Sequence, residues 1–145
     1  DSNKDMVLNT LKYKPFIVKP NEFELGEMFG AKPNSVEDIK KYARKLQEMG
    51  AQNVLVSRGS KGAILFTSNG DVLGANIAKG KVVSTIAEGD SMLAMFVAKY
   101  DETKDFKLSL QYASAAGGAT SFSAGVGKKE LIEELLVQIK VEEVL

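Results

Sequence analysis

The sequence has 145 residues, of which 44% are apolar and 26% charged, which is enough for one globular domain with a core of its own. Its 19 basic and 19 acidic residues cancel, which argues against the strongly basic surface typical of nucleic-acid-binding proteins. The sequence contains no cysteine and no histidine, which excludes disulfides, thiolate and imidazole metal sites, and Ser-His-Asp catalysis.

The first third of the chain alternates helix and strand patterns. Residues 1–14 begin with good capping residues and continue with apolar side chains at helical spacing, which predicts a short amphipathic helix. The apolar run Phe16–Val18 is typical of a buried strand in a parallel sheet. Residues 21–29 then predict a helix that Asn21 begins and Gly30 ends.

The middle third predicts one helix and several strands. Ser35–Met49 has apolar residues at helical spacing, with Ser35 as its N-cap and Gly50 as its end. The β-branched and apolar runs at Asn53–Ser57 and Ala63–Thr67 predict two strands. An Asn-Gly-Asp sequence after the second of them predicts a β-hairpin.

The turn between those two strands, Ser57–Gly62, is a candidate ligand loop. It contains two glycines, which allow a backbone to approach a ligand closely, and two basic residues, of which Lys61 can pair with a phosphate. Composition alone favours a plain hairpin turn with Lys61 exposed.

The stretch from Ser84 to Phe96 predicts a loop that feeds a helix. A β-type run, Lys81–Val83, precedes it, and the apolar helix Asp90–Tyr100 follows and is expected to be buried. The first amides of a helix have no intrahelical acceptor, so with the helix dipole they form a site for an anion. Asp90 beside such a site is a candidate general base for phosphoryl transfer. The competing interpretation is an ordinary helix start that Asp90 or Ser91 caps.

The last third predicts two helices and a short tail. Asp105–Thr120 is rich in small residues near its end, which suits close packing or a flat ligand, and a Gly/Ser loop follows at 121–127. Lys128–Lys140 is an amphipathic helix, and Val141–Leu145 either adds an edge strand or hangs loose. We therefore predict a single α/β domain over residues 1–145, with a mostly parallel sheet and an antiparallel hairpin.

Four ordered segments together resemble the C-terminal half of the ribokinase/PfkB carbohydrate kinases. They are an Asn-x-x-Glu element, a strand–turn–strand unit, a signature loop and a small-residue helix: Lys19–Glu24, Val54–Ala63, Val82–Phe96 and Ala115–Thr120. The resemblance is nearest to the members that phosphorylate fructose 1-phosphate or tagatose 6-phosphate. It implies a truncated, ribokinase-like α/β/α sheet and ATP-dependent phosphorylation of a sugar phosphate, with ATP and Mg²⁺ as cofactors.

The resemblance also implies roles for individual residues. The catalytic loop comprises Ala87, Glu88, Gly89 and Asp90, with Asp90 as the general base. The nucleotide is expected at Ser57, Arg58, Gly59, Ser60, Lys61, Gly62, Gly89, Asp90, Gly117 and Ser121. Asn21 and Glu24 are expected to hold Mg²⁺ through water or phosphate, although both could instead form a capping box for their own helix. The loops of Asn21, Ser57 and Asp90 are expected at one edge of the sheet.

Two departures from the family pattern bear on activity. Ala87-Glu88 stand where the family has Gly-Ala, and Ala87 does not easily adopt a positive φ. A Glu88 carboxylate about 4 Å from the phosphate would be repelled by roughly 4 kcal/mol at an effective dielectric near 20, whereas one facing solvent would cost little. The segments that bind the sugar in the family are absent, and the sequence begins with Asp1 rather than methionine, so we expect a fragment.

These departures leave two further interpretations open. One is a non-catalytic nucleotide-binding module, and the other is an interaction domain that keeps only the fold and exposes an apolar patch. The expected partners are ATP and a phosphorylated sugar, with neither nucleic acid nor membrane, and a homodimer is one expected assembly. Without a transmembrane segment or signal peptide, the expected location is the cytoplasm.

Overall fold

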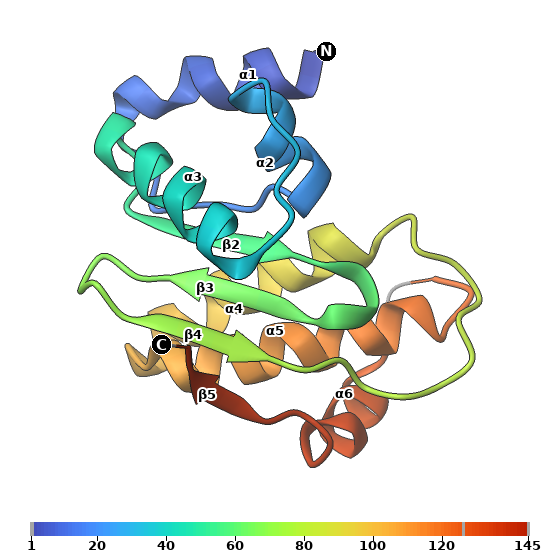
Figure 1. The fold of residues 1–145 in the computed structure, drawn as a ribbon. Helices are drawn as coiled ribbons and strands as arrows, with labels where there is room; N and C mark the ends of the chain where they lie inside the picture. Colours follow the sequence, from blue (N-terminus) through green and yellow to red (C-terminus); the bar gives the residue numbers. More distant parts are fainter. Residues whose placement is uncertain (1, 126, 145) are drawn as a thin grey trace. The chain divides into compact units, whose positions relative to one another are not determined.

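A computed structural model describes residues 2–125 and 127–144 (Figure 1). Its helices are α1 (Ser2–Thr10), α2 (Glu22–Met28), α3 (Val36–Met49), α4 (Glu88–Thr103), α5 (Phe106–Ser121) and α6 (Lys129–Leu136). Its strands are β1 (Ile17–Val18), β2 (Asn53–Ser57), β3 (Ala63–Phe66), β4 (Val72–Ala75) and β5 (Val141–Glu143). Short 3₁₀ turns occupy Leu11–Tyr13 and Gly59–Lys61.

The described strands form one five-stranded mixed sheet in the order β1-β2-β3-β4-β5. β1 pairs with β2 in parallel, with Ile17 opposite Asn53, whereas β4 pairs with β5 antiparallel, with Leu73 opposite Glu143. The predicted α/β class is therefore confirmed, and β5 is an edge strand, as one of the two alternatives for the tail proposed. Leu145 lies outside the described residues.

The chain divides into two compact units, each of which has its own packing. The first consists chiefly of residues 1–59 and 64–72. In it α3 packs on β2 and α2, and the fully buried side chains of Leu25, Ile39 and Leu46 come from α2 and α3. Both predicted ends of α3 are confirmed. The Ser35 hydroxyl accepts a hydrogen bond from the Asp38 amide at the start of the helix, and Gly50 follows its last turn with φ of 136°.

The second unit consists of residues 60–63 and 73–144. Its centre is the pair α4 and α5, with α6 packed against α5. The rings of Phe96, Tyr100 and Phe106 stack in sequence, with centroids 6.4 and 4.5 Å apart, and link the end of α4 to the start of α5. The organisation of residues 1–145 as a single domain stays a prediction.

Four expectations for the second unit are wrong in detail. Lys81–Val83 is not a strand, and Val82 and Val83 are more than half exposed. α4 begins at Glu88, two residues earlier than predicted, and only Met92 and Phe96 of its side chains are buried. α6 ends at Leu136, where the sequence predicted a helix to Lys140.

None of the helices in the described part of the chain is both long and apolar enough to cross a bilayer.

Candidate functional site

The Asn-x-x-Glu element forms the start of α2. The Asn21 Oδ1 accepts a hydrogen bond from the Glu24 amide at 2.7 Å, and the Glu24 Oε1 accepts one from the Asn21 amide at 2.9 Å. This is a complete capping box, so the structural interpretation of both residues is confirmed. The box uses the side-chain Oδ1 of Asn21 and the Oε1 of Glu24. It does not use the second carboxylate oxygen of Glu24, the Oε2.

Asn21 and Ser57 lie together at the carboxyl ends of two parallel strands. The pairing of β1 with β2 continues beyond β1 as an isolated parallel bridge between these residues, and the Ser57 amide donates to the Pro20 carbonyl at 3.2 Å. Ligands of open α/β sheets commonly bind outside the carboxyl ends of the strands, where the loops that follow parallel strands lie at the same edge.

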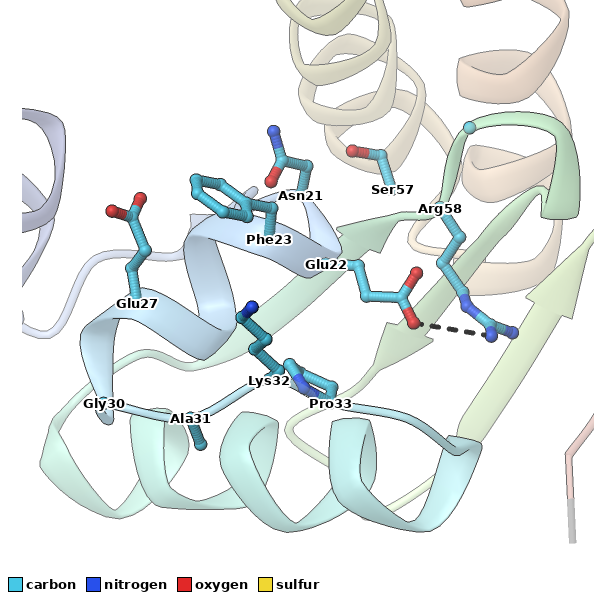
Figure 2. A pocket seen from close by; sticks show the side chains of 11 residues that line it. Asn21, Glu22, Phe23, Glu27, Gly30, Ala31, Lys32, Pro33, Ser57 and Arg58 are labelled. Atoms are coloured by element: carbon cyan, nitrogen blue, oxygen red, sulfur yellow. Dashed lines mark ion pairs between the residues drawn. The ribbon is translucent and has the colours of Figure 1, made fainter.

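An open pocket of about 910 Å³ adjoins these two residues in the first unit (Figure 2). Its walls come from the start of α2, the loop between α2 and α3, and the end of β2. The lining residues are Asn21, Glu22, Phe23, Glu27, Gly30, Ala31, Lys32, Pro33, Ser57, Arg58 and Gly59.

Arg58 is the main cation of the pocket wall. Its guanidinium forms an ion pair with the Glu22 carboxylate (Figure 2), at 3.6 Å. The Arg58 side chain is only 14% exposed. Its Nε is buried and finds no acceptor within the described residues. A half-paired, largely buried guanidinium can still bind an incoming anion, because an unsatisfied charged donor is costly to leave buried.

The rest of the predicted ligand turn is mostly exposed. Gly59 and Gly62 have φ of 57° and 89°, conformations that glycine adopts without strain. Ser60 and Lys61 between them are exposed, whereas Gly62 is buried. A side chain at Gly62 would collide with the Ala75 carbonyl oxygen, so packing in the second unit already explains that glycine.

α4 begins without a capping side chain. Its N-cap is Ala87, and neither Asp90 nor Ser91 accepts a hydrogen bond from the first turn, so the predicted cap is wrong. The Ser91 amide donates to the Ala87 carbonyl at 3.0 Å, whereas the amides of Gly89 and Asp90 find no acceptor in the described chain. Asp90 is exposed in the same turn. The helix start thus presents free N–H donors beside a carboxylate.

The substitution of alanine at position 87 causes no backbone strain. Ala87 has φ of −101°, and Gly89 is also outside the positive-φ region. The glycine-to-alanine departure is therefore compatible with this loop conformation.

The Glu88 side chain is half-buried, and its stem lies against α5. A methyl group on Gly117 would lie 3.5 Å from the Glu88 Cγ and 2.6 Å from the Met92 Cγ. Gly117 is itself buried, so close packing of α4 on α5 accounts for the small residue there. Its predicted part in nucleotide binding stays a prediction.

Ser121 positions the loop that leads to α4. It is 4% exposed, and its carbonyl accepts hydrogen bonds from the amides of Val83 and Ser84, at 2.7 and 3.1 Å. The adjacent Thr120 hydroxyl donates to the Ser91 Oγ at 2.8 Å and accepts from the Gly127 amide at 3.0 Å. Thr120 is thus a positioning residue that the sequence did not single out, because a threonine at the end of a small-residue helix carries no distinctive pattern.

Asn21 and Glu24 suit a magnesium ion only as residues that hold it through bound water or phosphate. Among the described residues there is no group of three carboxylate, histidine or cysteine side chains that could enclose a metal. The Glu24 oxygen outside the capping box is one suitable donor. Mg²⁺ usually keeps several waters and binds one or two carboxylates together with substrate phosphates, so this sparse donor set fits it.

Comparison with known proteins places the chain among sugar kinases. The sequence profile described as "pfkB family carbohydrate kinase" matches residues 1–132. The 1-phosphofructokinase of Bacillus subtilis is 40% identical over 141 residues, and the D-tagatose-1-phosphate kinase of Bacillus licheniformis is 40% identical over 142 residues. Each match covers 97% of this chain and 46% of the relative.

Solved structures share the fold. A Staphylococcus aureus protein provisionally assigned as a phosphofructokinase superposes with a TM-score of 0.91 at 35% identity, over 97% of this chain and 45% of that one. The ribokinase of Arabidopsis thaliana, solved with ribose and ATP, superposes with a TM-score of 0.76 at 29% identity, over 83% of this chain and 40% of its own. The chain thus spans about half the length of the relatives it matches.

Proposed function

Because the chain belongs to the pfkB family of carbohydrate kinases, we propose that it supplies the nucleotide-binding and catalytic-loop half of a longer sugar-phosphate kinase, here called the parent. The observation that carries the proposal is the start of α4, where an exposed Asp90 and two amides without an acceptor among the described residues lie in one helical turn. The expected ribokinase-like fold supports it, as does the coverage of about half of each relative.

The substrate proposed for the parent is a phosphorylated ketohexose. The two relatives reported above are a 1-phosphofructokinase and a D-tagatose-1-phosphate kinase. Both names point to a sugar 1-phosphate, which favours a 1-phosphate substrate over the tagatose 6-phosphate expected from the sequence. The region that selects the sugar is proposed to lie outside this chain, in the part of the relatives that it does not cover.

In the proposed reaction, Asp90 accepts the proton of the sugar hydroxyl as that oxygen attacks the γ-phosphorus of ATP. The bond from the γ-phosphorus to the bridging oxygen breaks and ADP leaves. The amides of Gly89 and Asp90 donate to the transferring phosphoryl group, where the helix dipole favours its negative charge. Such positioned donors act strongly because they need no reorganisation during the reaction.

ATP is the proposed nucleotide and Mg²⁺ the proposed metal. A solved relative at 29% identity was crystallised with ATP, which supports the choice. The nucleotide is proposed to contact Arg58, Ser57 and the exposed part of the 59–62 turn. The Glu24 carboxylate oxygen that the capping box does not use is proposed to hold a magnesium-bound water. When bound, Mg²⁺ would neutralise charge on the β- and γ-phosphates.

The test is a matched pair of charge-neutralising substitutions in the parent. Asp90→Asn should lower kcat by about 10²- to 10⁴-fold, the usual contribution of a general base, with little change in the melting temperature. Glu88→Gln removes the neighbouring carboxylate and should not lower kcat, since its stem lies against α5. An Asp90→Asn parent with undiminished kcat would rule out the base assignment.

A non-catalytic nucleotide-binding module is the second candidate. The observation that favours it is the half-buried Glu88, a carboxylate beside the proposed phosphate site. In that case the parent would bind ATP but show no sugar-dependent turnover, and neither substitution would change a rate.

A further inference from the structure

The middle of one face of α4 is apolar and largely exposed. Asp90, Leu93, Ala94, Val97, Ala98 and Asp101, here called the α4 face, recur at the three- and four-residue spacing that places side chains on one side of a helix. They line a shallow depression of about 550 Å³. Ala94, Val97 and Ala98 are exposed, Val97 by 42%.

The opposite side of the same helix is packed. Met92 and Phe96 are buried, at 6% and 0% exposure, where α4 lies against α5. A surface helix of a globular protein normally turns charged residues to solvent and apolar ones to the core. α4 instead has apolar residues on both sides, which is the pattern of a helix covered on both sides.

More apolar residues are exposed just before the helix. Val82, Val83 and Ile86 are 57%, 58% and 93% exposed in the loop that leads to α4. Together with the α4 face they form a run of exposed apolar side chains within one stretch of sequence, beyond what scattered surface residues would give.

We propose that the α4 face is the docking surface for the half of the kinase that this chain does not contain. The inference rests on the proposed function only for the existence of a parent, and on the finding that the relatives are about twice as long as the matched segment. The small side chains of Ala94 and Ala98 let a partner helix approach closely, between the larger Leu93 and Val97.

The charges at the ends of the face argue against a parallel pair formed with a second copy of this chain. Asp90 and Asp101 are eleven residues apart, about 16 Å along a helix. If two copies of α4 packed side by side in parallel, each acidic end would face the same acidic end of the other helix. In an antiparallel pair, Asp90 would face Asp101, whose carboxylate is already paired with the Lys104 Nζ at 3.6 Å. The fitting partner is therefore an apolar element of the missing half, seated on the middle of the face between the two acidic ends.

The test compares one substitution in two settings. Val97→Asp should leave the melting temperature of the 145-residue chain unchanged, because Val97 is exposed there. In the parent it should lower the melting temperature by at least several degrees, because the charge would be buried. Val137→Asp is the matched control, since Val137 is 85% exposed and lies outside the face, and it should be neutral in both settings.

A milder variant covers the case in which the Val97→Asp parent does not fold. Val97→Ala should then shift the melting temperature of the parent downward and that of the isolated chain hardly at all. Equal shifts in both settings would overturn the proposal. So would sedimentation data that show the isolated chain as a dimer that Val97→Asp dissociates, because the occupant would then be a second copy. The melting temperatures do not depend on turnover, so an inactive parent would refute the proposed function without deciding this inference.

Discussion

At the scale of the residue, two glycines of the 59–62 turn have different physical reasons to be glycine. Gly59 has φ of 57° and open space around it, so only backbone strain disfavours a side chain there. Gly62 has φ of 89°, and its Cβ position is occupied by the Ala75 carbonyl oxygen. Because that obstacle is backbone, it cannot move aside by changing a rotamer.

We therefore expect the two substitutions to differ in the free energy of unfolding. Gly59→Ala should lower it by about 1 to 2 kcal/mol, the cost of a left-handed conformation for a residue with a Cβ. Gly62→Ala should lower it by more than about 3 kcal/mol, because overpacking adds to the same strain. Urea unfolding of the chain measures both. Equal losses would mean that the contact with Ala75 relaxes without cost.

For the start of α4, the sequence predicted which groups lie together but not where the helix begins or how it is capped. Asp90 was expected beside unpaired amides, and the structure has both in one turn. The cap was wrong because Gly-Asp-Ser is a common helix start, whereas here the helix begins two residues earlier at an alanine that supplies no side-chain acceptor. Single-residue preferences cannot resolve such a shift, since the loop is held by the Ser121 carbonyl from a distant helix.

At the scale of the element, local signals determined most of the secondary structure. β2 and α3 match their predicted ranges because strand composition, an N-cap and a terminal glycine all agree there. Lys81–Val83 failed because β-branched residues form a strand only where a partner strand is available. The predicted burial of α4 was wrong for a related reason: its apolar composition indicates cover on both sides, and the described residues cover it on one.

The α2 capping box allows the structural and the ligand roles of Asn21 to be separated. Asn21→Ala removes the side-chain acceptor and should lower the free energy of unfolding by about 1 kcal/mol, whereas Asn21→Asp keeps an acceptor and should be nearly neutral. In the parent, Asn21→Asp should nevertheless raise the KM for ATP, because it places a negative charge beside the proposed phosphates. An unchanged KM in the stable Asn21→Asp parent would reduce Asn21 to a cap.

At the scale of the whole molecule, the length of the chain limits which part of the proposed reaction it can supply. The residues proposed to bind the nucleotide and to act as the base all lie within the 145 residues, whereas the chain covers only 46% of its curated relatives. Phosphoryl transfer needs the acceptor hydroxyl held in line with the γ-phosphate, and small misplacements are costly. If the chain supplies the donor side alone, as proposed, it can bind the nucleotide without holding the acceptor.

We accordingly expect the 145-residue chain to bind Mg·ATP and not to phosphorylate fructose 1-phosphate. Calorimetric titration should show saturable binding that Arg58→Ala weakens, because the guanidinium in the pocket wall would no longer contact the phosphates. Lys129→Ala is the matched control, since that exposed cation on α6 lies outside every proposed contact and should leave the affinity unchanged. No heat at millimolar Mg·ATP would count against the nucleotide half of the proposal, whereas sugar-dependent ADP release by the chain alone would show that the acceptor side is not needed.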